Sequence, residues 1–206
     1  MSAIIPQLIT ADDMLGEVIF TQNINNDNIK GFIMKAIRKD LQPRIHATFF
    51  ANIQVVYNLA AWSGTTAYVI GDKVTYSNRA WRSIQAGTNK NPVSQTAYWT
   101  EVELYSVWRD YLKPYLIYRS AALAMTWGGV NITRAGARYF KETTSDNIPL
   151  EERVKYAAML NADADLCFIG FNKYMKDNSY IVDGFDYTPN YSTVTPFKPK
   201  INIDLI

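Results

Sequence analysis

The 206-residue sequence has few of the residues on which many catalytic and metal sites depend. It contains one cysteine, Cys167, and one histidine, His46. A single cysteine excludes a disulfide within the chain, and one residue of each kind is too few for the usual zinc sites. The glycine-containing segment GGVNITRAG, residues 128–136, has neither the spacing nor the lysine of a phosphate-binding loop. The sequence therefore predicts neither a metal nor another cofactor.

No combination of side chains typical of an enzyme active site is present either. His46 lies in the apolar segment RIHATFF without a serine or cysteine nucleophile motif, which favours a structural histidine over a catalytic one. Glu151 and Glu152 are adjacent, so on a helix their carboxylates point apart and cannot close on one substrate. Asp163 and Asp165 are expected on a solvated helix face rather than in a cation site. We therefore predict no catalytic residues and no enzymatic activity.

Charge of one sign and long apolar runs are also scarce. The formal net charge is +2 and charged residues make up 19% of the chain, which gives no general indication of nucleic acid or of an acidic membrane surface as a partner. No uncharged apolar stretch approaches the length that a bilayer span needs, and the first residues lack the pattern of a signal peptide. We expect a protein without a membrane partner, made in a reducing cytoplasm.

Aromatic residues, in contrast, are abundant. They make up 14% of the sequence and include 14 tyrosines and five tryptophans. Tyrosine and tryptophan bury a large area at a low entropic cost while keeping a polar group, so they are enriched at interfaces. This composition favours a protein that binds other macromolecules or sugars.

Helical periodicity dominates both ends of the chain. Apolar residues at helical spacing predict a helix near residues 26–41, which Pro43 should end or kink because proline removes a backbone donor. Further helices are predicted over residues 104–127, with a kink at Pro114, and over residues 149–177. The pattern is typical of a mainly helical protein.

Residues 60–102 interrupt this helical pattern. Polar and apolar residues alternate there, and YSNRAW, residues 76–81, predicts a hairpin turn between two strands. The segment AWSGTTAYVIGDKVTYSNRAWRSIQAGTNKNPVSQTAYWTEV, residues 61–102, resembles the small carbohydrate-binding modules of the family 5 and 12 type that are attached to chitinases and cellulases. The matching positions are Trp62, Tyr68, Gly71, Asp72, Val74, Tyr76, Trp81, Pro92, Tyr98 and Trp99.

The resemblance implies that some of these rings stack on sugars. It places Tyr68, Trp81, Tyr98 and Trp99 in or near that role. A module of this size also has little aliphatic core, so aromatic side chains are needed in its interior. The residues expected in the interior are Trp62, Val74, Tyr76 and Ile84, with Trp99 a candidate for either place. Both interpretations of the aromatic residues remain open.

The helical part resembles the head–tail adaptor, or connector, proteins of tailed bacteriophages. The similarity lies in the order of elements: the helix YLKPYLIYRSAALAM, the short GVNITRAG hairpin, a long final helix and a stretched tail. The resemblance implies a ring of copies, expected to be a dodecamer, beneath the portal protein. A crAss-like phage of a Bacteroidetes host is the expected source. A generic helical bundle is the alternative interpretation of the same pattern.

The expected fold is mainly α: an adaptor-like helical bundle with a small antiparallel β module inserted and an extended C-terminal tail. The helical core comprises residues 1–59 and 103–178, the module residues 60–102, and the tail residues 179–206. The tail holds too many large apolar residues for a solvated linker, so we expect it to lie along a surface of its own or a neighbouring subunit.

These observations predict a structural virion protein that forms a ring in the phage neck, between portal and tail, by subunit packing and tail exchange. The expected partners are further copies of the chain, the portal protein and other neck or tail proteins. Arg134 and Arg138 are candidates for contacts with a partner or for lining a channel near packaged DNA. The expected location is the head–tail junction of the virion, after assembly in the host cytoplasm. The alternative function is that of a carbohydrate-binding protein, with a glycan bound by the aromatic residues of the module.

Overall fold

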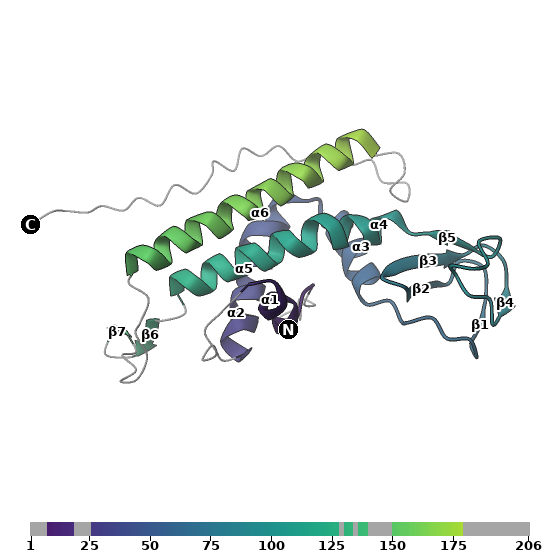
Figure 1. Ribbon diagram of the computed structural model, residues 1–206, viewed down its shortest axis with the longest axis horizontal. Helices are drawn as coiled ribbons and strands as arrows, with labels where there is room; N and C mark the ends of the chain where they lie inside the picture. Colours follow the sequence, from purple (N-terminus) through teal and green to yellow (C-terminus); the bar gives the residue numbers. More distant parts are fainter. Residues whose placement is uncertain (1–7, 19–25, 128–129, 134–135, 140–149, 179–206) are drawn as a thin grey trace, which may run out of the picture.

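The chain is mostly helical and carries a small antiparallel β module, as the sequence predicts at this level of detail (Figure 1). The computed structural model describes residues 8–18, 26–127, 130–133, 136–139 and 150–178, and of residues 26–28, 127, 130–133 and 136–139 it describes the backbone. The tail predicted over residues 179–206 lies outside these ranges.

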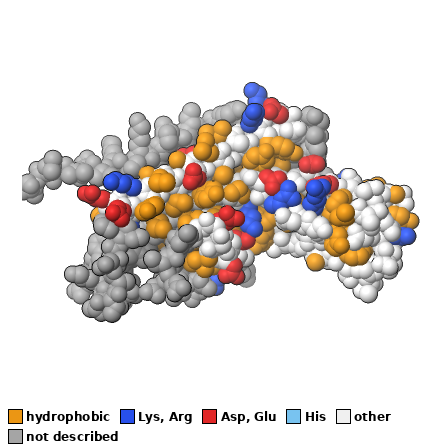
Figure 2. Space-filling view, in the orientation of Figure 1, with side chains coloured by type: hydrophobic (Ala, Val, Ile, Leu, Met, Phe, Trp, Pro, Cys, Tyr) orange, Lys and Arg blue, Asp and Glu red, His pale blue; other side chains and the backbone are white. Residues whose placement is uncertain are grey.

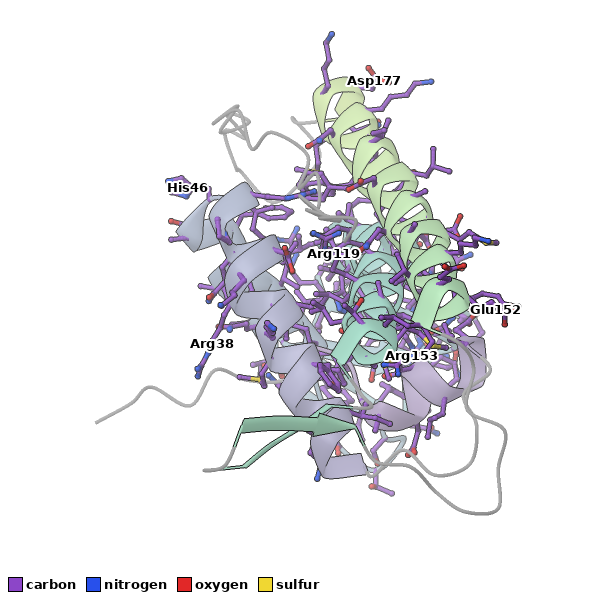
Figure 3. All side chains as sticks on the ribbon, turned by 90° about the vertical axis from the view of Figure 1, so that its left-hand side faces the viewer. Arg38, His46, Arg119, Glu152, Arg153 and Asp177 are labelled. Carbon is purple, nitrogen blue, oxygen red and sulfur yellow. The ribbon has the colours of Figure 1, made fainter. Side chains whose placement is uncertain are left out.

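The helices pack in layers around α5, Lys113–Trp127. The long helix α6, Leu150–Asn178, lies along one side of α5, and α2, Asn26–Ala36, contacts α5 from another side (Figures 1 and 3). The short helix α1, Ala11–Glu17, also contacts α5, and α3, Ala47–Tyr57, packs against α4, Glu103–Val107. The predicted helices over 104–127 and 149–177 are confirmed to within one residue at each end.

In the described part of the chain two π turns interrupt the helices, and each one ends two residues before a proline. In η1, Ile37–Leu41, the Gln42 N–H donates to the carbonyl of Ile37, and Pro43 follows in the 3₁₀ turn η2, Gln42–Arg44. In η3, Trp108–Leu112, the Lys113 N–H donates to the carbonyl of Trp108, and Pro114 follows. A proline ring clashes with the carbonyl four residues earlier, and the wider i to i−5 turn relieves that crowding. The expected kinks at these prolines are thus one-residue expansions of the helix.

One continuous hydrophobic core joins the six α-helices of the described residues. Its largest fully buried side chains are Tyr115, Phe49, Phe171, Leu8, Ile9, Met14, Ile29, Ile33, Ile37, Leu41, Ile53 and Leu112. Burying side chains of this size contributes roughly 1.5–3 kcal/mol each. The same cluster includes Ala80 and Val102, which belong to the β module and its exit. The module therefore shares the core of the helices at one end.

The β module is built from two small antiparallel sheets. Strands β2, Lys73–Tyr76, β3, Arg79–Ser83, and β5, Trp99–Glu101, form a three-stranded sheet in the order β2-β3-β5. The strands β1, Ala67–Tyr68, and β4, Gly87–Thr88, pair separately. The hairpin predicted at YSNRAW joins β2 to β3 through Ser77 and Asn78, whose φ angles of 52° and 57° are those of a type I′ turn.

A short hairpin separates α5 from α6. Strand β6, Val130–Thr133, pairs antiparallel with β7, Gly136–Tyr139. This is the hairpin predicted from GVNITRAG. Of the two arginines expected at a partner or channel surface, Arg134 lies outside the described residues. Arg138 is paired with Asn131 through the backbone of β7, and its side chain lies outside the described part.

Candidate assembly surfaces

The interior of the β module is aromatic, and it contains three of the four rings that the resemblance assigns to sugar binding. Tyr68, Trp81 and Trp99 are buried together with Val74. The Tyr68 and Trp99 rings meet edge-on at 5.2 Å, and the Trp99 Nε1–H donates to the carbonyl of Lys90. Buried rings present no face to a ligand, so the sugar-stacking role expected for these three residues is corrected to a core role.

The remaining aromatic residues of the module are partly exposed. The Trp62 and Tyr76 rings meet each other edge-on, with 5.2 Å between their centroids, and both pack against the buried cluster. This is near the interior position expected for them. Tyr98 is also partly exposed, but the Lys90 ammonium lies over its ring at 4.9 Å from the centroid. The structure therefore brings no pair of the four predicted sugar-binding rings together at the surface.

Ile84 was expected inside the module, and this expectation is wrong. Its side chain is 42% exposed. The preceding residue, Ser83, points inward instead, and its buried hydroxyl donates to the carbonyl of Gln85. Strand β3 ends at Ser83, and Ile84 lies in the bend that follows it, so the sheet no longer directs the Ile84 side chain to the interior. Hydrophobicity alone assigns the wrong one of these two neighbours to the core.

The module is fixed to the helices by polar contacts as well as by the shared core. The guanidinium of Arg109, in η3, donates from Nη1 to the carbonyl of Asn78 in the hairpin turn at 2.7 Å, and it also forms a bidentate pair with Asp110. On the module side, Arg79 pairs with Glu101 at 2.9 Å. The Arg109 contact holds the β2–β3 hairpin against η3, and the Arg79–Glu101 pair joins β3 to β5 within the module.

A pocket of about 230 Å³ lies at this junction. Its lining residues are Glu17, Asn78, Arg109, Lys113, Pro114, Ile117 and Tyr118. The two cations in this lining have partners within the chain: Arg109 pairs with Asp110, and the Lys113 ammonium lies 2.6 Å from Asp13. We therefore assign no ligand to this pocket.

Asp13 links α1 to α5 through this ion pair. It also completes a capping box with Thr10, in which the Thr10 hydroxyl accepts from the Asp13 N–H and the Asp13 carboxylate accepts from the Thr10 N–H. Burial alone would raise the pKa of Asp13. The hydrogen bonds from Lys113 and Thr10 outweigh that effect and lower the pKa. The ionised carboxylate is thus part of the native packing of α1.

A polar network crosses the helical layers. Arg119 of α5 donates to Asn161 of α6 at 2.6 Å and to Asp40 of η1 at 3.2 Å. The guanidinium of Arg44 lies over the Phe168 ring, and it is 3.6 Å from the Asp165 carboxylate. Arg119 and Asp40 are mostly buried, so their pairing depends on this geometry. The network fixes the register of α6 against α5 and η1.

Tyr115 lies beside this network without joining it. Its ring is fully buried, and its hydroxyl has no hydrogen-bond partner among the described residues. Burial raises the pKa of Tyr115 to about 12, Arg44 partly offsets that rise, and Asp40 adds to it. An ionised Tyr115 would be a charge inside the core.

The single histidine and the single cysteine both have structural surroundings. His46 is the N-cap of α3, and its Nδ1 accepts a hydrogen bond from the Thr48 N–H at 3.3 Å. Cys167 is half-buried against the core, and burial raises the pKa of its thiol. Within the described ranges no group of three or more His, Cys, Asp or Glu side chains could hold a metal ion. In the same part of the chain, no helix is both long and apolar enough to cross a bilayer.

The first exposed apolar surface lies on α6. The inner face of this helix buries Ala157, Ala164, Phe171 and Met175. On the opposite face, Met159, Ala162, Leu166 and Ile169 follow one another at spacings of three, four and three residues. Met159, Leu166 and Ile169 are 62%, 65% and 62% exposed. We call these four residues the α6 stripe, and Figure 2 shows orange side chains along this helix.

The second exposed surface is the outer face of α3. Phe49, Phe50, Ile53 and Val56 point into the core, so the opposite side of the helix carries Ala47, Thr48, Ala51 and Val55. We call these four the α3 face. Val55 is 57% exposed, and residues 45–71 contain no Asp, Glu, Lys or Arg. Sequence reasoning missed both surfaces, although the 3-4-3 spacing on α6 and the uncharged run around α3 could have indicated them.

The fold and these surfaces can be compared with known proteins. No curated protein and no solved structure matches the chain significantly. A family described as a family of unknown function (DUF6712) matches residues 71–195, more than half of the chain. The match takes in the β module from Gly71 onward together with α4, α5 and α6. By that extent the chain belongs to the DUF6712 family.

Proposed function

We propose that this protein is a structural subunit of a phage virion that forms a ring in the neck, between portal and tail. The observation that carries the proposal is the α6 stripe, in which Met159, Leu166 and Ile169 are each more than 60% exposed. Monomeric proteins rarely expose such contiguous rows, and an assembling subunit covers them. The role requires burial and complementarity rather than catalysis.

The ring, its portal and tail partners, the location at the head–tail junction and assembly in the host cytoplasm belong to this proposal. So do the contacts of Arg134 and Arg138 with a partner or with a channel near packaged DNA. Two features support a rigid subunit of this kind. The Arg119 network locks three helical segments together, and Arg109 holds the β module in one orientation.

The test is electron microscopy of the purified chain, alone and mixed with a candidate portal protein. The expected result is a closed ring, alone or on the portal, with the β modules as knobs at one radius. A chain that stays monomeric in both samples would contradict the proposal.

Glycan binding is the second candidate function, and Trp62, Tyr76 and Tyr98 are the partly exposed rings that would carry it. All three pack against the module interior, so we rank this function below assembly. Affinity electrophoresis on chitin and cellulose tests it. We expect no retardation of the wild type. Retardation that Trp62→Ala and Tyr98→Ala abolish, in a chain that forms no ring, would reverse the ranking.

A further inference from the structure

The two exposed surfaces point away from each other. Helices α3 and α6 meet in the core through Phe49 and Phe171, whose ring centroids are 5.8 Å apart. Each helix turns its inner face to that contact, so the α6 stripe and the α3 face look outward in opposite directions. Figure 3 shows the same order, with Arg119 of α5 between Glu152 on α6 and His46 at the start of α3. A subunit with two such surfaces can bind copies on both sides.

The two surfaces are complementary in side-chain size. The α6 stripe projects the long side chains of Met159, Leu166 and Ile169, whereas the α3 face has mostly small side chains. At about 1.5 Å per residue, the stripe is about 15 Å long and the α3 face about 12 Å. Long side chains on one helix fill the spaces above small ones on another, as knobs fit into holes.

The charges around the two surfaces also fit. Lys155 and Lys173 are exposed beyond the two ends of the stripe, about 27 Å apart along the helix at about 1.5 Å per residue. Helix α3 has 11 residues and is about 16 Å long, so both lysines would lie outside its ends rather than against it. No charged residue between positions 45 and 71 would be buried without a partner.

We propose that the α6 stripe of one subunit packs on the α3 face of a second copy of this chain. The inference rests on the proposed ring function and names the two surfaces that would build the ring. Because the surfaces differ and face opposite ways, the contact is head-to-tail, and repetition of a head-to-tail contact closes a ring when the rotation per subunit permits.

The experiment uses two disrupting variants of the full chain, Leu166→Glu in the α6 stripe and Val55→Glu in the α3 face. Val69→Glu is the matched control, since Val69 is an aliphatic residue of similar exposure, 61%, on the β module. Oligomer mass is measured by mass photometry over a concentration series, and circular dichroism checks that each variant keeps its helices. Each disrupting variant should raise the dissociation constant at least about tenfold, because it buries an unpaired charge, while Val69→Glu should leave it unchanged.

Mixing the two disrupting variants tests which surfaces meet. Leu166→Glu keeps an intact α3 face and Val55→Glu keeps an intact α6 stripe, so an equal mixture should form dimers that grow no further. A Val55→Glu variant that still assembles like the wild type, or a mixture that forms no dimers, would overturn the α6–α3 contact.

The outcome for the proposed function is separate. If both disrupting variants still form the rings that the wild type forms, the proposed ring function stands and the α6–α3 contact is refuted. A wild type that stays monomeric at every concentration would refute the α6–α3 contact, because that contact needs no other protein. Rings that form only on an added portal would still support the function.

Discussion

At the scale of single residues, Tyr115 is one of several core residues with a polar atom that is buried without a partner among the described residues. The Tyr115→Phe change removes its hydroxyl and keeps the ring. We expect the free energy of unfolding at pH 7 to stay the same or rise by about 1 kcal/mol, since no hydrogen bond is lost. Urea unfolding measures this, and a loss of stability would show that the hydroxyl has a partner.

The same variant tests a pH dependence. The pKa of Tyr115 is raised to about 12 from an ordinary value near 10. Because the pKa is raised, Tyr115 keeps its proton in the folded chain between pH 10 and pH 12, where the same side chain loses its proton in the unfolded chain. The free energy of unfolding is therefore unaffected by this group below pH 10 and falls as the pH rises towards 12. The wild type should lose about 1.4 kcal/mol per pH unit in this range relative to Tyr115→Phe. Parallel stability curves for the two proteins would contradict the burial effect.

Arg119 represents the opposite case, a mostly buried charge with partners. The Arg119→Met change leaves Asp40 without its cation, and we expect a loss of about 3 kcal/mol, as for other buried ion pairs. Arg79→Met is the control, because its pair with Glu101 is largely exposed and should contribute less than about 1 kcal/mol. Urea unfolding of both variants makes the comparison. Equal losses would mean that the buried Arg119 network contributes no more to the free energy of unfolding than the exposed Arg79–Glu101 pair.

Residue types could not decide which aromatic side chains of the module are buried. Trp62, Tyr68 and Trp99 all suit a core or a sugar face, and burial in so small a module depends on which neighbours close over each ring. The same limit applies to Ile84, because its exposure depends on the end of β3 at the preceding residue, Ser83. The candidate site was therefore the part that the sequence predicted least well.

At the scale of secondary structure, the β2–β3 turn has a residue poorly suited to its backbone. Ser77 has a φ of 52°, a conformation that asparagine and glycine adopt more readily than serine. Ser77→Asn should stabilise the protein by several tenths of a kcal/mol, and Ser77→Val should destabilise it by about 1–2 kcal/mol. Thermal unfolding of both variants provides the test, and a tolerated valine would exclude the type I′ turn.

Helix limits were the best predicted feature. The limits of α6 follow from Glu151 and Glu152 near its start and from Lys176 near its end, and Pro114 marks the expected interruption within residues 104–127; all are local signals. The π turns were not predicted, because a proline announces a break but not whether the chain kinks or adds a residue. That choice is made by packing on both sides of the turn.

At the scale of the whole molecule, the β module was expected to be inserted between two parts of the helical core. Ala80 and Val102, however, lie in the same core cluster as Leu104 and Val107 of α4. We therefore predict that module and helices unfold in one transition. In a Trp108→Phe, Trp127→Phe background the remaining tryptophans, Trp62, Trp81 and Trp99, all lie in the module.

Tryptophan fluorescence then reports on the module, and far-ultraviolet circular dichroism reports mainly on the helices. Their midpoints in urea should coincide. An earlier fluorescence transition would show that the module folds and unfolds as a separate unit.

The π turn η3 lies between the module and the long helices, and it affects the orientation of the module relative to them. One residue of an α-helix corresponds to about 100° of rotation. The extra residue at Trp108–Leu112 therefore sets the orientation of the module about the helix axis, relative to the helical layers. In a closed ring, every subunit repeats that orientation of the module. Deletion of a single residue in this turn would rotate α4 and the module by about 100° relative to α5, and it would therefore break the core packing that α4 shares with α3.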